Sequence, residues 1–248
     1  MNPDLRDNWR TKSWEEMAQE NALAAVMTTP DMMASSGLTD ARLSDFFSRG
    51  RDIFQRHIMP VPSDGLIVEY GCGAGRILRA VANEGYACAG IDISPTMVDL
   101  CRRFVPSAET HLLEKGRTPL PDGCASLVFS YAVVQHIALL SDYEKAFGEM
   151  CRLLRPGGVL KVQVGTDDFR KGFERQGRTQ NEETYSVHFT PAGARYERQQ
   201  DNWNGVCIGA DAQILILAKH GVVFDGWRFH KPDKPSRVVW LTAHRPRL

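Results

Sequence analysis

The feature that most constrains this chain is a glycine-rich loop between a short apolar strand and a helix. The strand is predicted over residues 66–70, and the loop that follows reads Gly71-Cys72-Gly73-Ala74-Gly75. Glycine lets the backbone turn tightly and approach a ligand without a Cβ in the way. Free amide N–H groups at the start of the next helix favour a negatively charged group. The loop therefore predicts a ligand-binding strand–loop–helix unit, and a tight turn without a ligand is the alternative.

The spacing of the glycines indicates which ligand this loop binds. A dinucleotide-binding loop has the pattern GxGxxG, but the place of its third glycine is taken here by Arg76. Glu69, just before the loop, opposes a pyrophosphate and suits the ammonium and sulfonium groups of S-adenosylmethionine (SAM). Asp92 ends the second predicted strand, at the distance from Gly71 at which an acid reaches ribose hydroxyls. The loop and the acid together predict a SAM site.

Apolar runs and helical patterns alternate through the middle of the chain. Ser94-Pro95 is a helix start, with serine as the N-cap and proline at the first helical position. Ser141 with Glu144 resembles a capping box, and Pro156 is expected to end the helix that it opens. The predicted strands are 66–70, 86–93, 111–113, 126–131, 159–164, 222–229 and 238–243, and the other predicted helices here are 77–85, 95–104 and 211–220. This alternation implies a mostly parallel sheet with right-handed crossovers.

The regions before and after this alternation have a different character. Residues 1–62 are expected to be a helical extension or lid, because apolar residues recur at helical spacing from Leu43 to Ile58, before Pro60 and Pro62. Residues 63–248 form the predicted SAM-binding domain. Within it the long polar stretch 165–209 is expected to cap the acceptor pocket, and a solvated surface excursion is the alternative.

The ordered motifs resemble the class I SAM-dependent methyltransferases, in particular their small-molecule group. Glu69 to Gly75 match the family's first motif, Asp92 matches its second, and Met97 matches a position that often packs on the adenine. The resemblance runs over about residues 66–164 and resumes for the last two strands. It implies an α/β, Rossmann-like fold whose seven-stranded, mostly parallel sheet has an antiparallel last strand and helices on both faces. The candidate cofactor-binding residues are Glu69, Gly71, Gly73, Gly75, Arg76, Asp92, Ile93, Met97, Gly116, Arg117 and Ser130.

Two parts of the site depart from the family pattern or stay open. After the third strand the family has an acid that contacts the adenine; here either Glu114 fills that place or Lys115-Gly116 does so with its backbone. Ser126 stands where the fourth strand usually begins with an acid. His136, just after the fourth strand, is the candidate catalytic residue, as a base or as a group that orients the acceptor. The alternative is a helix-start histidine that bonds to backbone or caps the cofactor. No metal-ligand cluster is expected near this strand.

Composition narrows the function further. The formal net charge of the 248 residues is zero, which does not suit a nucleic-acid partner. No apolar run reaches the roughly 18 residues of a membrane span. The six cysteines form no CxxC pair and indicate a reduced, cytoplasmic protein. We expect methyl transfer to a small molecule, with O-methylation favoured on prevalence among relatives. Decarboxylation or cyclisation on the same fold is the alternative, as is a non-catalytic SAM-binding module. The sequence leaves the oligomeric state open.

Overall fold

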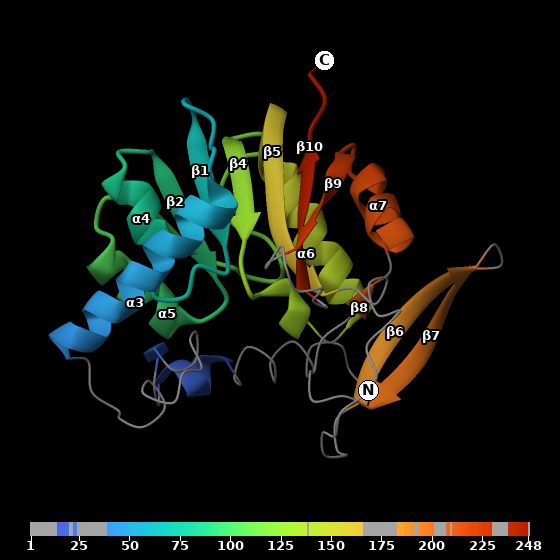
Figure 1. Cartoon of the computed structure of the whole chain (residues 1–248), viewed down its shortest axis with the longest axis horizontal. Coiled ribbons are helices and arrows are strands. Elements are labelled where there is room, and N and C mark those ends of the chain that lie inside the picture. Colours follow the sequence, from blue (N-terminus) through green and yellow to red (C-terminus); the bar gives the residue numbers. More distant parts are fainter. Residues whose placement is uncertain are drawn as a thin grey trace. The chain divides into compact units, whose positions relative to one another are not determined.

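The computed structural model divides into two compact units, a first unit over Met1–Leu120 and a second over Pro121–Leu248 (Figure 1). The residues that the structure describes are 14–19, 22–23, 39–137, 139–165, 183–190, 193–200, 207–208, 210–229 and 238–247. Within these residues no helix is both long enough and apolar enough to cross a membrane.

The first unit begins with helices, as the sequence predicts. Residues 14–19 form one helical turn and more, and α3 (Asp40–Ile53) continues into a π-helical turn over Phe54–Ile58. Thr39 caps α3 by accepting from the backbone N–H of Arg42. Phe46, Gly50, Phe54 and Ile58 form the buried side of this long element. Gly50 allows a close approach, since a Cβ built there would lie 1.9 Å from the carbonyl oxygen of Arg76.

Three parallel strands follow in the first unit. Strand β1 (Leu66–Tyr70) pairs with β2 (Cys88–Asp92), and β2 pairs with β3 (Glu109–Leu112). The connections are α4 (Leu78–Asn83) and α5 (Pro95–Phe104), both of which pack against β2. The prediction for the start of α5 is confirmed, because the Ser94 hydroxyl accepts from the backbone N–H of Met97 and Pro95 occupies the first turn.

The second unit contains the remaining strands of the main sheet. Strand β4 (Ala125–Ser130) is parallel to β5 (Leu154–Gly165), while β10 (Val238–His244) is antiparallel to both β5 and β9 (Val223–Phe229). Helix α6 (Leu140–Leu153) packs against β4 and β5, and α7 (Ala210–Lys219) packs against β9 and α6. The capping-box prediction is wrong: α6 begins before Ser141, its N-cap is Leu139, and no side chain caps it.

Part of the polar stretch 165–209 forms a small separate sheet. Strands β6 (Glu183–Thr190) and β7 (Gly193–Gln200) are antiparallel, and β8 (Cys207–Ile208) is parallel to β6. The sequence analysis did not predict these strands. A signal was present, because Tyr185, Val187 and Phe189 alternate with polar residues as in a strand with one apolar face.

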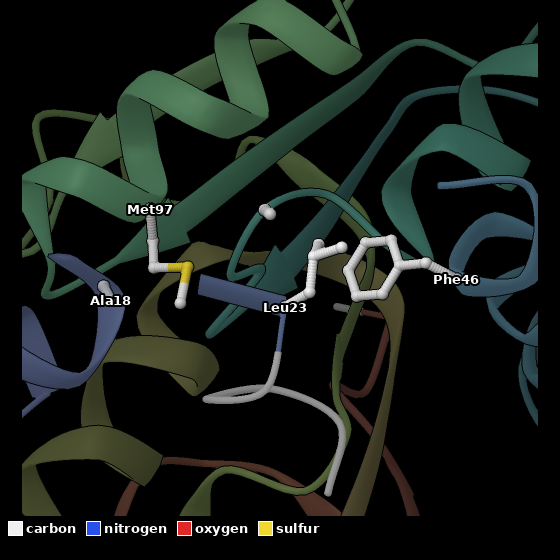
Figure 2. Close-up of a cluster of buried hydrophobic side chains, with 5 residues drawn as sticks. Ala18, Leu23, Phe46 and Met97 are labelled. Carbon is white, nitrogen blue, oxygen red and sulfur yellow. The ribbon is translucent and has the colours of Figure 1, made fainter. Parts of the chain in front are cut away.

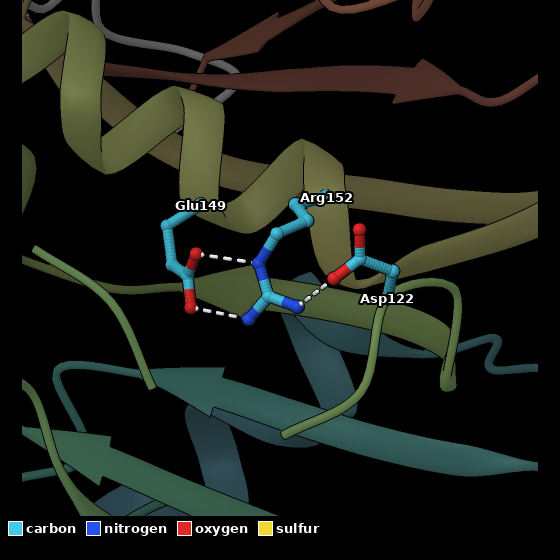
Figure 3. A network of polar contacts seen from close by, with 3 residues as sticks. All are labelled: Asp122, Glu149 and Arg152. Atoms are coloured by element: carbon cyan, nitrogen blue, oxygen red, sulfur yellow. Dashed lines mark hydrogen bonds and ion pairs between the residues drawn. The ribbon is translucent and has the colours of Figure 1, made fainter. Parts of the chain in front are cut away.

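A partly buried ion-pair network ties the end of α6 to the turn before β4 (Figure 3). Arg152 donates to both carboxylate oxygens of Glu149, at 2.8 and 2.7 Å, and to Asp122 at 2.5 Å. The backbone carbonyl of Arg152 also accepts from the N–H of Gly123. The Arg152–Glu149 ion pair is bidentate, and such a pair is stronger than a hydrogen bond between two neutral groups. This network fixes the point at which β4 enters the sheet.

The strands of both units belong to one seven-stranded sheet with the order β3-β2-β1-β4-β5-β10-β9. This order, with β10 as the antiparallel strand, confirms the predicted Rossmann-like α/β class. The strand predictions are correct to within a few residues except at β5. There Pro156 and Gly157 lie inside the strand and do not end a helix outside it.

Candidate functional site

The glycine loop follows β1 directly and is fastened to the end of β2. All three loop glycines have positive φ angles, 78° at Gly71, 52° at Gly73 and 81° at Gly75, a conformation that other residues adopt at a cost. The backbone N–H of Gly71 donates to the carbonyl oxygen of Ile91 at 2.7 Å. A Cβ at Gly75 would lie 2.7 Å from a methyl carbon of Val105. The third glycine is therefore required by the loop conformation and also by the packing beneath it.

Asp92 joins the two motifs that the sequence analysis singled out. Its Oδ2 accepts from the backbone N–H of Gly73 at 2.8 Å, and its Oδ1 accepts from the N–H of Ser94 at 2.9 Å. Burial raises the pKa of the Asp92 carboxyl, and these backbone hydrogen bonds oppose the rise. The carboxylate is thus held between the glycine loop and the start of α5. Each of its oxygens keeps a further lone pair that can accept from a ligand hydroxyl.

Glu69 lies in β1 and is almost completely buried, with 3% of its surface exposed. Burial raises the pKa of its carboxyl well above the ordinary value, an effect that the charge of Arg76 partly offsets. Within the described part of the chain its Oε2 has no hydrogen-bond partner. A buried acceptor without a donor is costly. A cationic group such as an ammonium would satisfy this oxygen and favour the ionised carboxylate.

Met97, the expected adenine contact, lies in a buried apolar cluster of the first unit. The cluster joins Met97 of α5 to Ala74 of the glycine loop, Phe46 of α3, and Ala18 and Leu23 from the N-terminal segment. Figure 2 shows Leu23 and Phe46 pointing toward one another in this cluster, with Met97 reaching into it from α5. The N-terminal segment therefore reaches the glycine loop, a contact that the sequence did not indicate.

The segment after β3 forms a tight hairpin turn beside Asp92. The N–H and carbonyl groups of Glu114 exchange hydrogen bonds with those of Arg117, and Lys115 and Gly116 both have positive φ. Two central residues with positive φ are typical of a type I′ turn. The N–H of Leu113 donates to the carbonyl oxygen of Asp92 at 2.7 Å. The turn that carries the candidates Gly116 and Arg117 therefore lies beside the end of β2, and the candidate Ile93 directly follows Asp92.

Arg76 is directed toward α3. Its guanidinium carbon lies 5.8 Å from the ring centroid of Phe46, within the range of a cation–π contact. The structure thus brings the candidates Glu69 to Arg76, Asp92 to Met97 and the hairpin turn together in the first unit.

Ser130 and His136 belong to the second unit. Ser130 is the last residue of β4 and is completely buried. His136 ends a short 3₁₀ turn, with its N–H donating to the carbonyl oxygen of Val133. Partial burial lowers the pKa of the His136 imidazole, so the neutral form predominates at neutral pH. A neutral imidazole can accept a proton or donate a hydrogen bond.

Two residues that the sequence analysis missed hold the loop between Ser130 and His136. The Gln163 side chain of β5 accepts from the backbone N–H of Ala132 at 3.1 Å, and Ala132 has a φ of 58°. Trp240 of β10 stacks on Tyr131 with ring centroids 5.8 Å apart. Gln163 and Trp240 are register partners on neighbouring strands. No local pattern marks either residue, since their role depends on that pairing.

Comparison with known proteins identifies the region that carries this site. Residues 68–162 match the family described as Methyltransferase domain. They are a class I SAM-dependent methyltransferase domain. The chain is also similar in fold to the CcbJ methyltransferase from Streptomyces caelestis, with a TM-score of 0.59 and 14% identity over 79% of this chain and 89% of that one.

Relatives of the methyltransferase domain name several acceptors. A malonyl-[acyl-carrier protein] O-methyltransferase of Serratia marcescens is 33% identical over 38% of this chain and 36% of its own length. The tRNA (carboxymethyluridine(34)-5-O)-methyltransferase ALKBH8 of Mus musculus is 31% identical over 42% of this chain and 15% of its own length. A trans-aconitate 2-methyltransferase of Shigella dysenteriae is 26% identical over 75% and 69%. The chain thus spans much less than two thirds of the first two relatives.

SAM is the cofactor of this family, and the residues of the first unit fit it. The Oε2 of Glu69, which has no hydrogen-bond partner among the described residues, can accept from the ammonium of SAM. The Asp92 carboxylate can accept from the ribose hydroxyls, and Met97 offers an apolar contact for the adenine. Among the described residues no group of three His, Cys, Asp or Glu side chains gathers in a way that could hold a metal ion.

Proposed function

We propose that this protein is a SAM-dependent methyltransferase that forms a methyl ester on a carboxylate of a small molecule. The observation that carries the cofactor half of the proposal is the Asp92 carboxylate, which bonds both Gly73 of the glycine loop and Ser94 of α5. This arrangement gives a ribose diol an oriented acceptor next to a loop in which three glycines lack a Cβ atom. Glu69, buried beneath that loop, supplies the negative charge for the ammonium.

The acceptor half rests on what the named acceptors of the relatives have in common. The words malonyl, carboxymethyluridine and trans-aconitate each denote a molecule with a carboxyl group. Two of the three relatives act by name on oxygen. The acceptors of the first two relatives are carried on a macromolecule, an acyl-carrier protein in one and a tRNA in the other. The zero net charge of this chain nevertheless favours a small acceptor over a nucleic acid.

Basic side chains of the second unit suit such an anionic acceptor. Trp240 of β10 lies opposite Arg228 of β9 on one side and opposite Gln163 of β5 on the other, so these three residues share one face of the sheet. Lys161 lies two residues before Gln163 in β5 and is therefore on the same face as Arg228. Burial, and then the charge of Arg228, lowers the pKa of the Lys161 ammonium to about 8. A bound carboxylate next to this pair would relieve the repulsion between the two cations.

His136 has a narrower role in this proposal than in a hydroxyl methyltransferase. SAM, when bound, supplies an electrophilic methyl group on its sulfonium. A carboxylate with an ordinary pKa near 4 is already ionised at neutral pH, so His136 needs to remove no proton. We place neutral His136 as a hydrogen-bonding group that orients the acceptor. A conservative His136→Gln variant should then keep most of the turnover, while His136→Ala should raise the KM for the acceptor.

The test begins with the cofactor and ends with the product. Thermal unfolding is measured with SAM, S-adenosylhomocysteine and NAD added separately. A ligand at a hundred times its dissociation constant stabilises a protein by about 2.7 kcal/mol, so a shift of several degrees is expected with the first two alone. The protein is then incubated with SAM and a panel of dicarboxylic acids, malonyl thioesters, phenols and amines, and S-adenosylhomocysteine and methyl esters are measured by mass spectrometry.

Each result has a definite meaning. Methyl esters with dicarboxylates support the proposal, and an Asp92→Ala control should abolish both cofactor shift and product. Methylated amines or phenols without any ester would overturn the carboxylate acceptor but keep the methyltransferase. Product from SAM without S-adenosylhomocysteine would indicate a different reaction, such as decarboxylation. Absence of any shift with SAM would overturn the proposed function itself.

Two further assignments belong to the same proposal. We place stretch 165–209, with its hairpin β6–β7, as a cap on the acceptor pocket, and residues 1–62 as a helical extension with a lid function. We also place the protein in the cytoplasm, because Cys72, Cys88, Cys101 and Cys151 are free thiols. Deletion of residues 183–200 should raise the acceptor KM and leave SAM affinity unchanged.

A further inference from the structure

The Glu15 carboxylate of the N-terminal helix at residues 14–19 bonds to the start of α5. Glu15 Oε2 accepts from the Ser94 hydroxyl at 2.5 Å and from the backbone N–H of Thr96 at 3.1 Å. Glu15 Oε1 accepts from the Thr96 hydroxyl at 2.5 Å and from Gln19 of the same helix at 2.8 Å. A carboxylate is also favoured here by the partial positive charge at the start of α5. Both oxygens are therefore fully used across a contact between segments about 80 residues apart in sequence.

The same N-terminal segment covers the glycine loop with apolar side chains. Ala18, one turn after Glu15, and Leu23 are buried against Met97 and Ala74 (Figure 2). Ala74 is the central residue between the second and third loop glycines, and Met97 is the apolar contact assigned to the cofactor. Residues 14–19 and 22–23 thus lie directly on two groups that a bound cofactor would meet.

A chain of hydrogen bonds leads from Glu15 to the ribose-binding acid. Ser94 donates its hydroxyl to Glu15, accepts with the same oxygen from the N–H of Met97, and donates its N–H to Asp92. The hydroxyl and the N–H of Ser94 thus both take part in the chain. Loss of the Glu15 contact would free the Ser94 hydroxyl to rotate away from Met97, which loosens the start of α5 next to Asp92.

We propose that Glu15 is a positioning residue that latches the helix at residues 14–19 over the cofactor site, so that the cofactor enters and leaves only when this latch opens. The proposal rests on SAM binding as stated under the proposed function. A charge-assisted hydrogen bond shifts an equilibrium by roughly tenfold or more. Removal of the charge should therefore raise the population of the open segment by about tenfold.

The experiment compares Glu15→Gln with a matched control, Glu16→Gln, on the full chain. Glu16 is the next residue of the same helix and is exposed, so its variant has the same change of net charge. Hydrogen exchange of the peptide that contains residues 14–23 is followed without ligand. The dissociation rate of S-adenosylhomocysteine is followed by stopped-flow competition. Glu15→Gln should exchange faster and release S-adenosylhomocysteine about tenfold faster, while Glu16→Gln should behave as wild type.

A second variant separates the latch from a general loss of stability. Thr96→Val removes one hydroxyl donor from the α5 side and leaves Glu15 in place. It should also speed exchange and release, and the double variant should show less than the product of the two effects, because both remove the same contact. The β-sheet circular dichroism signal without denaturant should equal that of wild type in all variants, which shows that the main sheet stays folded while the segment opens.

The outcomes distinguish the latch from the proposed function. If the wild type binds S-adenosylhomocysteine and Glu15→Gln releases it at the wild-type rate, the latch is overturned and the methyltransferase stands. Faster exchange without faster release would overturn the latch as well and would leave Glu15 as a stabilising contact only. If the wild type does not bind S-adenosylhomocysteine at all, the proposed function fails first and the latch with it.

Discussion

Arg152 offers the sharpest test of how the second unit is held together. Its side chain is 13% exposed and contacts two acids of very different burial, since Glu149 is 4% exposed and Asp122 is 70% exposed. Replacement of Arg152 by Ala leaves the Glu149 carboxylate buried without its counter-ion. Breaking such a buried pair costs about 3–5 kcal/mol. The exposed contact to Asp122 contributes only about 0.2–1 kcal/mol.

These magnitudes translate into measurable differences in stability. For a chain of this length each kcal/mol shifts the unfolding midpoint by roughly 2–4 °C. Arg152→Ala should therefore lower the midpoint by roughly 6–20 °C, as measured by circular dichroism on heating and by urea unfolding at 25 °C. Asp122→Asn serves as the control for the exposed half of the network and should lower it by no more than about 4 °C.

A rescue variant tests the cause. Glu149→Gln removes the buried charge, so the double variant Arg152→Ala/Glu149→Gln should be more stable than Arg152→Ala alone. The reasoning is refuted if Arg152→Ala costs no more than Asp122→Asn. It is also refuted if removal of the Glu149 charge brings no recovery, because the cost would then come from lost packing of the arginine stem.

Two further predictions concern the first unit. Gly50→Ala places a Cβ 1.9 Å from the carbonyl oxygen of Arg76, so α3 must shift; we expect a loss of about 1–3 kcal/mol by urea unfolding, and an unchanged midpoint would contradict the close approach. Although partial burial opposes it, hydrogen bonds from Ser94 and Thr96 lower the pKa of Glu15 from 4.5 to about 2. A carboxyl with a lowered pKa adds stability that is complete above pH 4.5 and is lost as the pH falls toward 2. The stability gap between wild type and Glu15→Gln should therefore shrink over that range, and a gap that is independent of pH would refute the assignment.

The sequence determined those features whose cause is local. The glycine loop, the N-cap Ser94 and the acid Asp92 each depend on residues within a few positions, so their patterns are legible along the chain. The alternation of apolar strands and helices likewise fixed the class of sheet, because the right-handed crossover leaves few arrangements open. Local patterns predicted less where packing competes, as at Ser141, which cannot act as the N-cap because α6 begins two residues earlier than that role requires, with Leu139 as its N-cap.

Only the tertiary structure decided the contacts between segments distant in sequence. From the sequence alone, Glu15 is one of several charged residues on an amphipathic helix. Only the fold brings the Ser94 and Thr96 hydroxyls of α5 within hydrogen-bond distance of its carboxylate. Gln163 reads as a polar residue in a strand until β5 pairing brings it to the backbone of Ala132. Such contacts have no periodicity or spacing, because the free energy that selects them arises from burial and hydrogen bonding after the chain has folded.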